Sequence, residues 1–557
     1  MPASTTAVRL PPPSQIVRAL AGVVPAELSK SPLLGILGVI MGAGIVTLTG
    51  RMITLGLADL KGHVGISFDD GAWISSAYNI ALIFIGPFTV FLGGLMGPRR
   101  ILFFAATAFS LICIYIPFIH SYSLLITALV LAGLTSGTFY PLTLTFALRN
   151  IPLRFLPFTI ALYAICVDGA VNIAPSLYGW YRDHLSWEWM FWNSALITPL
   201  MVVCIYYGIP ASAAPKKSEA PSFAGFLYAS AGFAMLFAAF DQGERLDWWR
   251  SGVFTALFAG GSFFMVCALV RRLWSPNPLV DMPYLRQWNT VLLGIGLFLF
   301  RFCLVTTIIL VPQSLAIHGF EADQIGPAVI WSAAPLLLVA FVAGLLLLAK
   351  LDSRLLMAAG FACMAFASCL NAEITSAWSA SNYYRTEVLM GVGQSFAFIG
   401  LVATIVLQGI FSGGLSKPQW IMTFSAFFHT VRLFGGQLGA VLMGHFIAQR
   451  EKLHSNLLGL HVQRGNWITD GHIQALTAGL FSKSSGVPAA TGRAIGVMSS
   501  QLRLQAYTLS IIDGFYLVAW ACVVTLLLIA MLRKSPLSYG DLDAIQEHLP
   551  TPQEAKS

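Results

Sequence analysis

Residues Val291–Val311 read VLLGIGLFLFRFCLVTTIILV, an apolar run with one charged side chain, Arg301. A helix of about 20 apolar residues crosses the hydrocarbon core of a bilayer, so this run predicts a transmembrane helix. Thirteen further runs of similar length and polarity occupy most of the remaining chain. We therefore expect an all-α integral membrane protein with 14 transmembrane helices.

The composition of the chain agrees with this prediction. Apolar residues make up 57% and charged residues only 10% of the chain, whereas a soluble domain carries about 25% charged residues. The net charge of +8 does not indicate nucleic-acid binding, because no basic soluble face with stacking aromatics is visible. The cysteines all lie in apolar segments without disulfide or metal-ligand spacing, so we expect no metal site.

The turns between the predicted helices alternate in charge. Turns on the side of Met1 carry Arg99, Arg100, Arg149, Arg154, Lys216, Lys217, Arg271, Arg272, Lys350, Arg354 and Lys417. The opposite turns carry Asp59, Asp69, Asp70, Asp183, Glu188, Glu244, Asp247, Glu321 and Asp323. Because cytoplasmic loops are rich in Lys and Arg, we expect both termini in the cytoplasm. No cleavable signal peptide is apparent, and the predicted location is the cytoplasmic (inner) membrane.

The predicted spans fall into groups of six, two and six. They cover residues 33–57, 72–95, 100–119, 122–147, 156–179, 189–209, 223–240, 252–271, 289–312, 326–349, 355–371, 384–410, 420–447 and 509–533. Two helical bundles with a site between them are a layout of transporters. The spacing therefore predicts two six-helix bundles with a two-helix insert.

This grouping divides the chain into predicted parts. They are a cytoplasmic tail (1–32), an N-terminal bundle (33–209), an insert with its flanking loops (210–288), a C-terminal bundle (289–535) and a second cytoplasmic tail (536–557). Within the C-terminal bundle, residues 449–507 predict a long extracytoplasmic loop. Its positive charge fits that side, because long loops cross the membrane largely regardless of charge.

Four stretches of the chain stand out by their order and spacing. They are Gly71–Tyr78 (GAWISSAY), Trp187–Asn193 (WEWMFWN), Asp241–Trp249 (DQGERLDWW) and Phe428–Gly436 (FHTVRLFGG). With them the chain resembles the fourteen-span drug:proton antiporter family of the major facilitator superfamily, the EmrB/QacA type. The resemblance covers about residues 33–533 and implies the major facilitator fold.

The resemblance also implies a function. It is typical of a secondary active transporter that exports amphipathic organic compounds or drugs across the cytoplasmic membrane by proton antiport with alternating access. The proton gradient would be the energy source, and no cofactor is expected. The implied partners are a small-molecule substrate, the lipid bilayer and, as candidates, a periplasmic adaptor and an outer-membrane channel. The transport unit is expected to be a monomer that binds no nucleic acid.

The chain departs from the family pattern where the family couples transport to protons. Thr49 stands at the place of the usual first-span acid, with Arg51 two residues on. Leu129 replaces the usual buried arginine of the fourth span, residues 93–100 (GGLMGPRR) lack the usual aspartate, and 174–179 (APSLYG) replace Gly-Pro-x-x-Gly-Gly. An alternative function is therefore transport of organic anions with altered or absent proton coupling.

Ionisable residues inside the spans are the candidates for binding substrate or protons, because each costs about 2.5–3.5 kcal/mol to insert. Asp168 lies at the middle of the fifth span. Burial disfavours its charged form, so it fits a proton carrier or the partner of a cation. A structural ion pair with Arg51 or another arginine is an equal alternative. Arg301 lies midway along the ninth span, and its guanidinium suits a carboxylate or phosphate.

Three further residues complete the candidate set. Arg51 lies late in the first span, where its side chain could reach the surface, form an ion pair or contact substrate. Arg432 matches the family's arginine in the thirteenth span, so its role could be structural. Glu387 lies near the start of the twelfth span, where solvation at the membrane interface is favoured over a binding role. We predict no catalytic residue.

Other classes of protein were weighed against a transporter. Residues His318 to Asp323 fit the His-x-x-x-x-Asp pattern of some acyltransferases, but a two-residue match occurs by chance and no companion motif is present, so an enzyme is disfavoured. A non-transporting sensor on the same fold stays an alternative, because the coupling residues depart from the family pattern, although such a sensor would usually carry a soluble output domain. A channel is disfavoured because no re-entrant filter-like segment is visible.

Overall fold

The computed structural model describes residues 31–139, 155–208, 223–274, 286–411, 418–463, 465–535 and 538–541. Within these ranges the protein is all-helical, with no strand. The N-terminal half holds α2 (Pro32–Leu55), α3 (Leu57–Val64), α4 (Phe68–Met96), α5 (Pro98–Tyr115), α6 (Tyr122–Ser136), α8 (Leu156–His184) and α9 (Trp189–Gly208). Then follow α10 (Phe223–Gly243), α11 (Gly252–Trp274), α13 (Trp288–Cys303), α14 (Val311–Ile317), α15 (Ala322–Ile330), α16 (Leu336–Leu348), α17 (Ser353–Asn371), α18 (Ala380–Phe411), α19 (Pro418–Gly459), α20 (Trp467–Leu480) and α21 (Val487–Met531).

Among the described helices, 12 are long and apolar enough to cross a membrane. Two further apolar helices, α6 and α16, are shorter. Helices α2, α5, α8 and α21 each have proline in the first turn, where its missing N–H removes no intrahelical hydrogen bond. The protein is therefore a multi-pass membrane protein, and the described helices overlap the predicted apolar runs. The second part of the span predicted at 122–147 lies outside the described residues.

Two predicted spans are interrupted rather than continuous. The span predicted at 289–312 consists of α13, a π-helical segment at Thr306–Leu310 and α14. The span predicted at 326–349 consists of α15, turns at residues 331–335 and α16. Pro335 at the start of α16 has no N–H to continue the helical ladder. π-Helical segments often accompany functional sites, and the first interruption lies five residues after Arg301.

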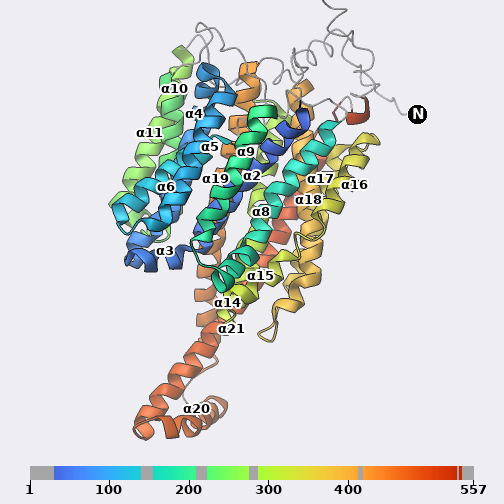
Figure 1. The fold of residues 1–557 in the computed structure, drawn as a ribbon. Helices are drawn as coiled ribbons and strands as arrows, with labels where there is room; N and C mark the ends of the chain where they lie inside the picture. The colour runs from blue at the N-terminus through green and yellow to red at the C-terminus, as the bar shows by residue number, and fades with distance from the viewer. Residues whose placement is uncertain are drawn as a thin grey trace, which may run out of the picture.

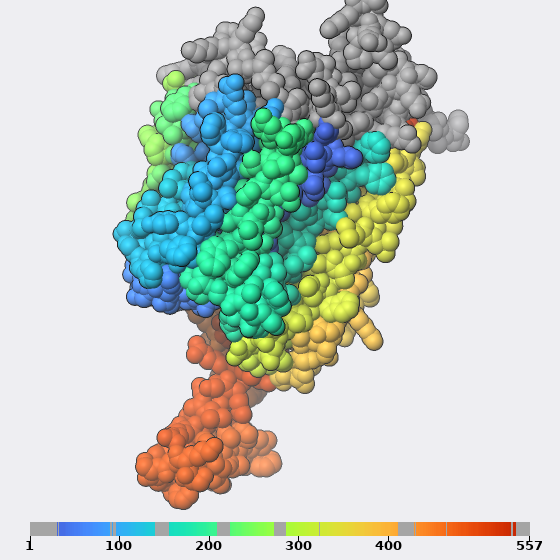
Figure 2. All heavy atoms as spheres, in the orientation of Figure 1, coloured from blue at the N-terminus to red at the C-terminus, as the bar shows by residue number. Residues whose placement is uncertain are grey.

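The prediction of a long loop at 449–507 is wrong about the local structure, because most of this segment is helical. Helix α19 continues to Gly459, and α21 begins at Val487. Asp513 of α21 accepts hydrogen bonds from Arg450 and His454 of α19. These paired charges join the two helices where they leave the helical body. The projecting ends of α19 and α21, together with α20, form a narrow arm that extends away from the helical body (Figure 2).

The two helices between the predicted bundles lie at one edge of the helical body. Helices α10 and α11 pack on each other, and α10 also packs on α4 and α19 (Figure 1). Helix α8 packs on α2, and also on α15, α16 and α18 of the C-terminal half. Contacts between the two halves therefore run through α8 on one side and through α4 and α19 on the other.

Glycines allow some helices to approach backbone to backbone. A Cβ placed on Gly360 of α17 would lie 2.1 Å from the backbone nitrogen of Ala397 on α18, and one on Gly391 would lie 1.9 Å from the backbone oxygen of Ser332. Small residues at such contacts are typical of helix packing in lipid. Gly360 and Gly391 therefore allow α18 to pack closely against two neighbouring segments.

We expect Gly360→Ala to destabilise the folded protein by about 1–3 kcal/mol, the usual cost of overpacking. The backbone of α18 would have to move, because the nearest atoms are main-chain atoms. Thermal unfolding of the purified protein measures the effect. Gly444→Ala on α19 is the matched control, since nothing lies within 4 Å of its added methyl group. Equal melting temperatures for the two variants would contradict this packing argument.

A short segment after α21 binds the end of the C-terminal half nearest the predicted cytoplasmic turns. Tyr539 is buried, and its hydroxyl donates to the backbone oxygen of Ala403 at 2.8 Å. The Lys350 ammonium lies 2.7 Å from the Asp541 carboxylate. This ion pair holds the pKa of Asp541 at about 2, below its usual value near 4.

We expect the Asp541–Lys350 pair to stabilise the protein above about pH 4 and to lose that effect as the pH falls toward 2. The folded-state pKa of Asp541 is lowered, so protonation at low pH removes the ion pair. Thermal unfolding of wild-type and Asp541→Asn protein across this pH range measures the difference. A difference in melting temperature between the two proteins that grows as the pH falls would contradict the assignment. The control is Glu373→Gln, which changes an exposed glutamate.

Candidate functional site

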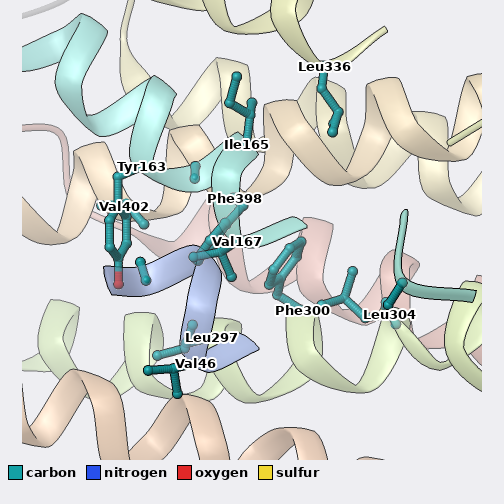
Figure 3. Packing of buried hydrophobic residues seen from close by; sticks show 14 of the residues in the cluster. Val46, Tyr163, Ile165, Val167, Leu297, Phe300, Leu304, Leu336, Phe398 and Val402 are labelled. Atoms are coloured by element: carbon teal, nitrogen blue, oxygen red, sulfur yellow. The ribbon is translucent and has the colours of Figure 1, made fainter. Parts of the chain in front are cut away.

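Asp168 lies in the middle of α8 and is 1% exposed. Within the described part of the chain, neither of its carboxylate oxygens has a hydrogen-bond partner. Apolar side chains from both halves of the chain pack here, including Val167, Leu336 and Phe398 (Figure 3). The sequence predicted a buried acid at this position, and the structure places it where α8 meets the C-terminal half.

Two arginines of the C-terminal half face this carboxylate. Arg301 of α13 and Arg432 of α19 are the charged groups that act on Asp168. Arg432 is 3% exposed. A carboxylate buried at low dielectric is stabilised by nearby cations, so the attraction crosses the contact between the two halves. Three candidates that the sequence gave separately thus form one cluster, the central charge cluster (Asp168, Arg301 and Arg432).

A pair of glycines leaves room for the Arg301 side chain. A Cβ on Gly436 of α19 would lie 2.8 Å from an Arg301 terminal nitrogen, and one on Gly435 would lie 3.2 Å from Phe298. The guanidinium therefore lies against the backbone of α19, one turn from Arg432. The sequence marks these glycines only as packing residues, and their role beside a charged group becomes visible from the structure.

Uncharged amides extend the cluster along α8. The Asn172 amide, one turn from Asp168, donates to Gln394 of α18 at 3.2 Å. The Gln394 amide in turn lies 3.3 Å from the hydroxyl of Thr307 in the π-helical segment. Asn172 and Gln394 are buried. Sequence reasoning did not single them out, although an amide inside an apolar span is itself a signal, because a buried polar group needs a partner.

Arg51 does not form the ion pair with Asp168 that the sequence left open. Its guanidinium donates to the backbone oxygen of Ile308 at 2.9 Å. Ile308 lies in the π-helical segment, so Arg51 connects α2 to the interrupted span. Two residues earlier, the Thr49 hydroxyl lies 2.7 Å from that of Ser194. The position of the family's first-span acid is therefore occupied by a hydroxyl that is hydrogen-bonded within the N-terminal half.

The prediction that Glu387 is solvated at the membrane interface is wrong. Its exposed fraction is 0%, because α18 begins seven residues earlier and packs along α17. Within the described residues, neither carboxylate oxygen has a hydrogen-bond partner. Glu387 is thus a second fully buried acid. Position near the end of an apolar run did not reveal this, since hydropathy does not tell which face of a helix is covered.

Asp241 joins three helices at the opposite side of the body. Its carboxylate, at the end of α10, accepts hydrogen bonds from Ser76 of α4 and Gln437 of α19. Nearby, His445 of α19 lies 2.6 Å from Glu244. The end of α10 and the turn after it therefore bind the N-terminal and C-terminal halves together on the side of the acidic turns.

A cavity of about 680 Å³ lies away from the central charge cluster. Residues of α4 and α6 line it, and nearly all of the lining is apolar. Trp73, Phe84 and Tyr122 are its aromatic members. Such a lining suits an apolar chain, but it offers no partner for a charged group. The ionisable candidates and this cavity are therefore separate features of the protein.

Comparisons with known proteins agree with the fold and with the order of the motifs. A family model described as Major Facilitator Superfamily matches residues 39–440. The probable multidrug resistance protein EmrY of Escherichia coli (strain K12) is 22% identical over 86% of this chain and 91% of its own length. The fatty acid resistance protein FarB of Neisseria gonorrhoeae is 23% identical over 86% of this chain and 92% of its own length.

A solved structure shows the same fold. The proton:xylose symporter XylE superposes with a TM-score of 0.53 at 11% sequence identity, covering 92% of this chain and 98% of that chain. The relatives confirm the resemblance to the EmrB/QacA type that the sequence motifs indicated. Because the superfamily model matches more than half of this chain, the chain belongs to the major facilitator superfamily.

Proposed function

We propose that this protein is a secondary active transporter that exports amphipathic organic compounds in exchange for protons, by alternating access. Members of the superfamily are transporters and not enzymes, which removes the acyltransferase interpretation of His318 and Asp323. The observation that carries the proposal is the fully buried Asp168 on the N-terminal half, faced by Arg301 and Arg432 of the C-terminal half.

The central charge cluster supports coupling because its members lie on opposite sides of a contact that must open. If the two halves rock apart, Asp168 loses the nearby arginines and gains water. Both changes act mainly on the charged form of Asp168, because loss of the arginines disfavours it and water favours it, so the proton affinity of the carboxylate differs between the two conformations. A proton that binds in one conformation and leaves in the other provides coupling, since a ligand shifts a conformational equilibrium only by its differential affinity.

The two arginines favour an acidic substrate. Each guanidinium carries a fixed positive charge with geometry suited to a carboxylate. One relative is named a fatty acid resistance protein, which agrees with an amphipathic anion as cargo. We therefore place amphipathic carboxylates first among the candidate substrates, ahead of lipophilic cations.

The remaining topology is part of the same proposal. With α6 and α16 counted as spans, the 12 longer helices become 14, and α10 and α11 form an insert between two six-helix bundles. Alternation of basic and acidic turns supports cytoplasmic termini in an inner membrane. The arm formed by the ends of α19 and α21 with α20 would then lie outside the cytoplasm, where a periplasmic adaptor could contact it.

Transport by purified protein in liposomes under an imposed pH gradient tests this function. The panel holds long-chain carboxylates, lipophilic cations and neutral amphipaths of matched chain length. We expect carboxylates to move against their gradient and to dissipate the pH gradient at the same time, as an internal pH dye reports. If no compound of the panel moves with or without the gradient, the proposed function is wrong.

A further inference from the structure

Glu387 is a site of its own, separate from the central charge cluster. It lies seven residues before Gln394 on α18, which is two helical turns or about 10 Å along the axis. Gln394 bonds Asn172, which is one turn from Asp168 on α8. Glu387 and Gln394 share one face of α18, because seven residues make about two turns. Glu387 therefore lies nearer to the acidic turns than Asp168 does.

The surroundings of Glu387 suit a neutral acid. The side-chain amide of Asn371 on α17 lies beside its carboxyl group. Across the described ranges, neither the carboxylate oxygens nor the amide atoms make a hydrogen bond of normal geometry. A buried carboxylate without a paired cation usually takes up a proton. The acid could then donate that proton to the Asn371 oxygen, which satisfies both groups.

Few other ionisable groups face this position. On its own helix, the hydroxyl of Tyr383 lies one turn away and interacts with it electrostatically. The helices packed against α18 carry Asp168 and Arg301 of the central charge cluster, exposed Asp323 of α15 and Arg354 at the far end of α17. Helix α8 also ends in three exposed ionisable residues, Arg182, Asp183 and His184. Among described residues, no ion pair includes Glu387.

Polar groups lie between Glu387 and the acidic turns. The Tyr383 hydroxyl lies 2.7 Å from that of Ser314 on α14. One ring nitrogen of His318, in the turn after α14, lies 2.5 Å from the Ser314 backbone oxygen. These groups make the end of α18 that is nearest the acidic turns more polar than its middle.

We propose that Glu387 and Asn371 form a second proton-binding site, on the extracytoplasmic side of the central charge cluster. In the binding step the carboxylate accepts one proton from hydronium, so one O–H bond breaks in hydronium, one forms on the carboxyl group, water is released and nothing is oxidised. This site deepens the proposed antiport. It rests on that proposed function only for what happens to the proton after it has bound. The hydrogen-bonded amides of Gln394 and Asn172 lie between this site and Asp168.

Infrared difference spectroscopy of the purified protein in lipid nanodiscs tests the site without any substrate. A pH titration should reveal a protonated carboxyl band that is absent in Glu387→Gln. The band should persist in Glu373→Gln, which changes an exposed glutamate in the turn after α17, and in Asp168→Asn. Labelling glutamate with carbon-13 in the wild-type protein should shift the band, which assigns it to a glutamate rather than to Asp168 without depending on the folding of any variant.

Three results separate the proposal from its alternatives. Identical spectra of wild-type and Glu387→Gln protein, without an isotope shift, would overturn it. Disappearance of the band on addition of sodium at constant pH would also overturn it, since the site would then bind a metal cation. If no compound of the transport panel moves in liposomes while the Glu387 band is present, the proposed function fails and this site stands.

Discussion

We expect pH-driven transport by the Asp168→Asn protein to fall to the level of liposomes without protein. Asparagine has nearly the same shape as aspartate, but it can neither bind the proton nor attract Arg301 and Arg432. Asp168 is 1% exposed and faces both arginines, so no other group of the central charge cluster can replace its carboxylate. The dye-reported pH change on addition of a transported carboxylate measures the loss.

A second measurement distinguishes lost coupling from lost folding. Exchange of labelled substrate across the membrane without a pH gradient should continue in Asp168→Asn, because exchange requires rocking but no net proton movement. Asp247→Asn is the matched control, since its side chain is exposed in the turn after α10. Wild-type coupling in Asp168→Asn would remove this acid from the mechanism.

The second large effect is expected for Arg301→Gln. A hydrogen bond to a charged group contributes about 1.5–3 kcal/mol, so the half-saturating concentration of acidic substrates should rise roughly ten- to a hundredfold. The half-saturating concentrations of neutral and cationic compounds should stay the same. Arg385→Gln controls for a change of net charge, because this arginine of α18 is exposed.

Thermal unfolding separates two roles for Arg301. If it binds substrate, its replacement lowers affinity for carboxylates with little change in melting temperature. A lower melting temperature with unchanged affinity for every compound would instead make it a structural partner of Asp168. The guanidinium lies against the backbone of Gly436, so the variant removes an interaction with α19 in either case.

The sequence predicted the helices well because the bilayer imposes one strong rule on apolar runs. Val291–Val311 predicted a span, and α13 and α14 lie there. The π-helical interruption between them was not predictable, because hydropathy carries no information on the register of backbone hydrogen bonds. The helical nature of residues 449–459 was missed for a related reason. It depends on the contact of Arg450 and His454 with Asp513.

The candidate site was predictable residue by residue but not as an arrangement. A charge in an apolar span is conspicuous, so Asp168, Arg301 and Arg432 were found. Which arginine faces the acid depends on helix packing between distant segments, and Arg51 was therefore an equal candidate until its bond to Ile308 was seen. Asn172 was missed because it carries no charge, although a polar amide in an apolar span needs a buried partner.

The arm of the C-terminal half has a mechanical consequence. Helix α21 runs unbroken from Val487 to Met531, so the intramembrane part and the projecting part form one rigid lever. Its projecting part, about 22 residues, is roughly 33 Å long. A tilt of about 10° within the membrane would therefore sweep the tip through roughly 6 Å. A fluorophore on α20 would convert such a tilt into a readable displacement, far from the central charge cluster and from Glu387.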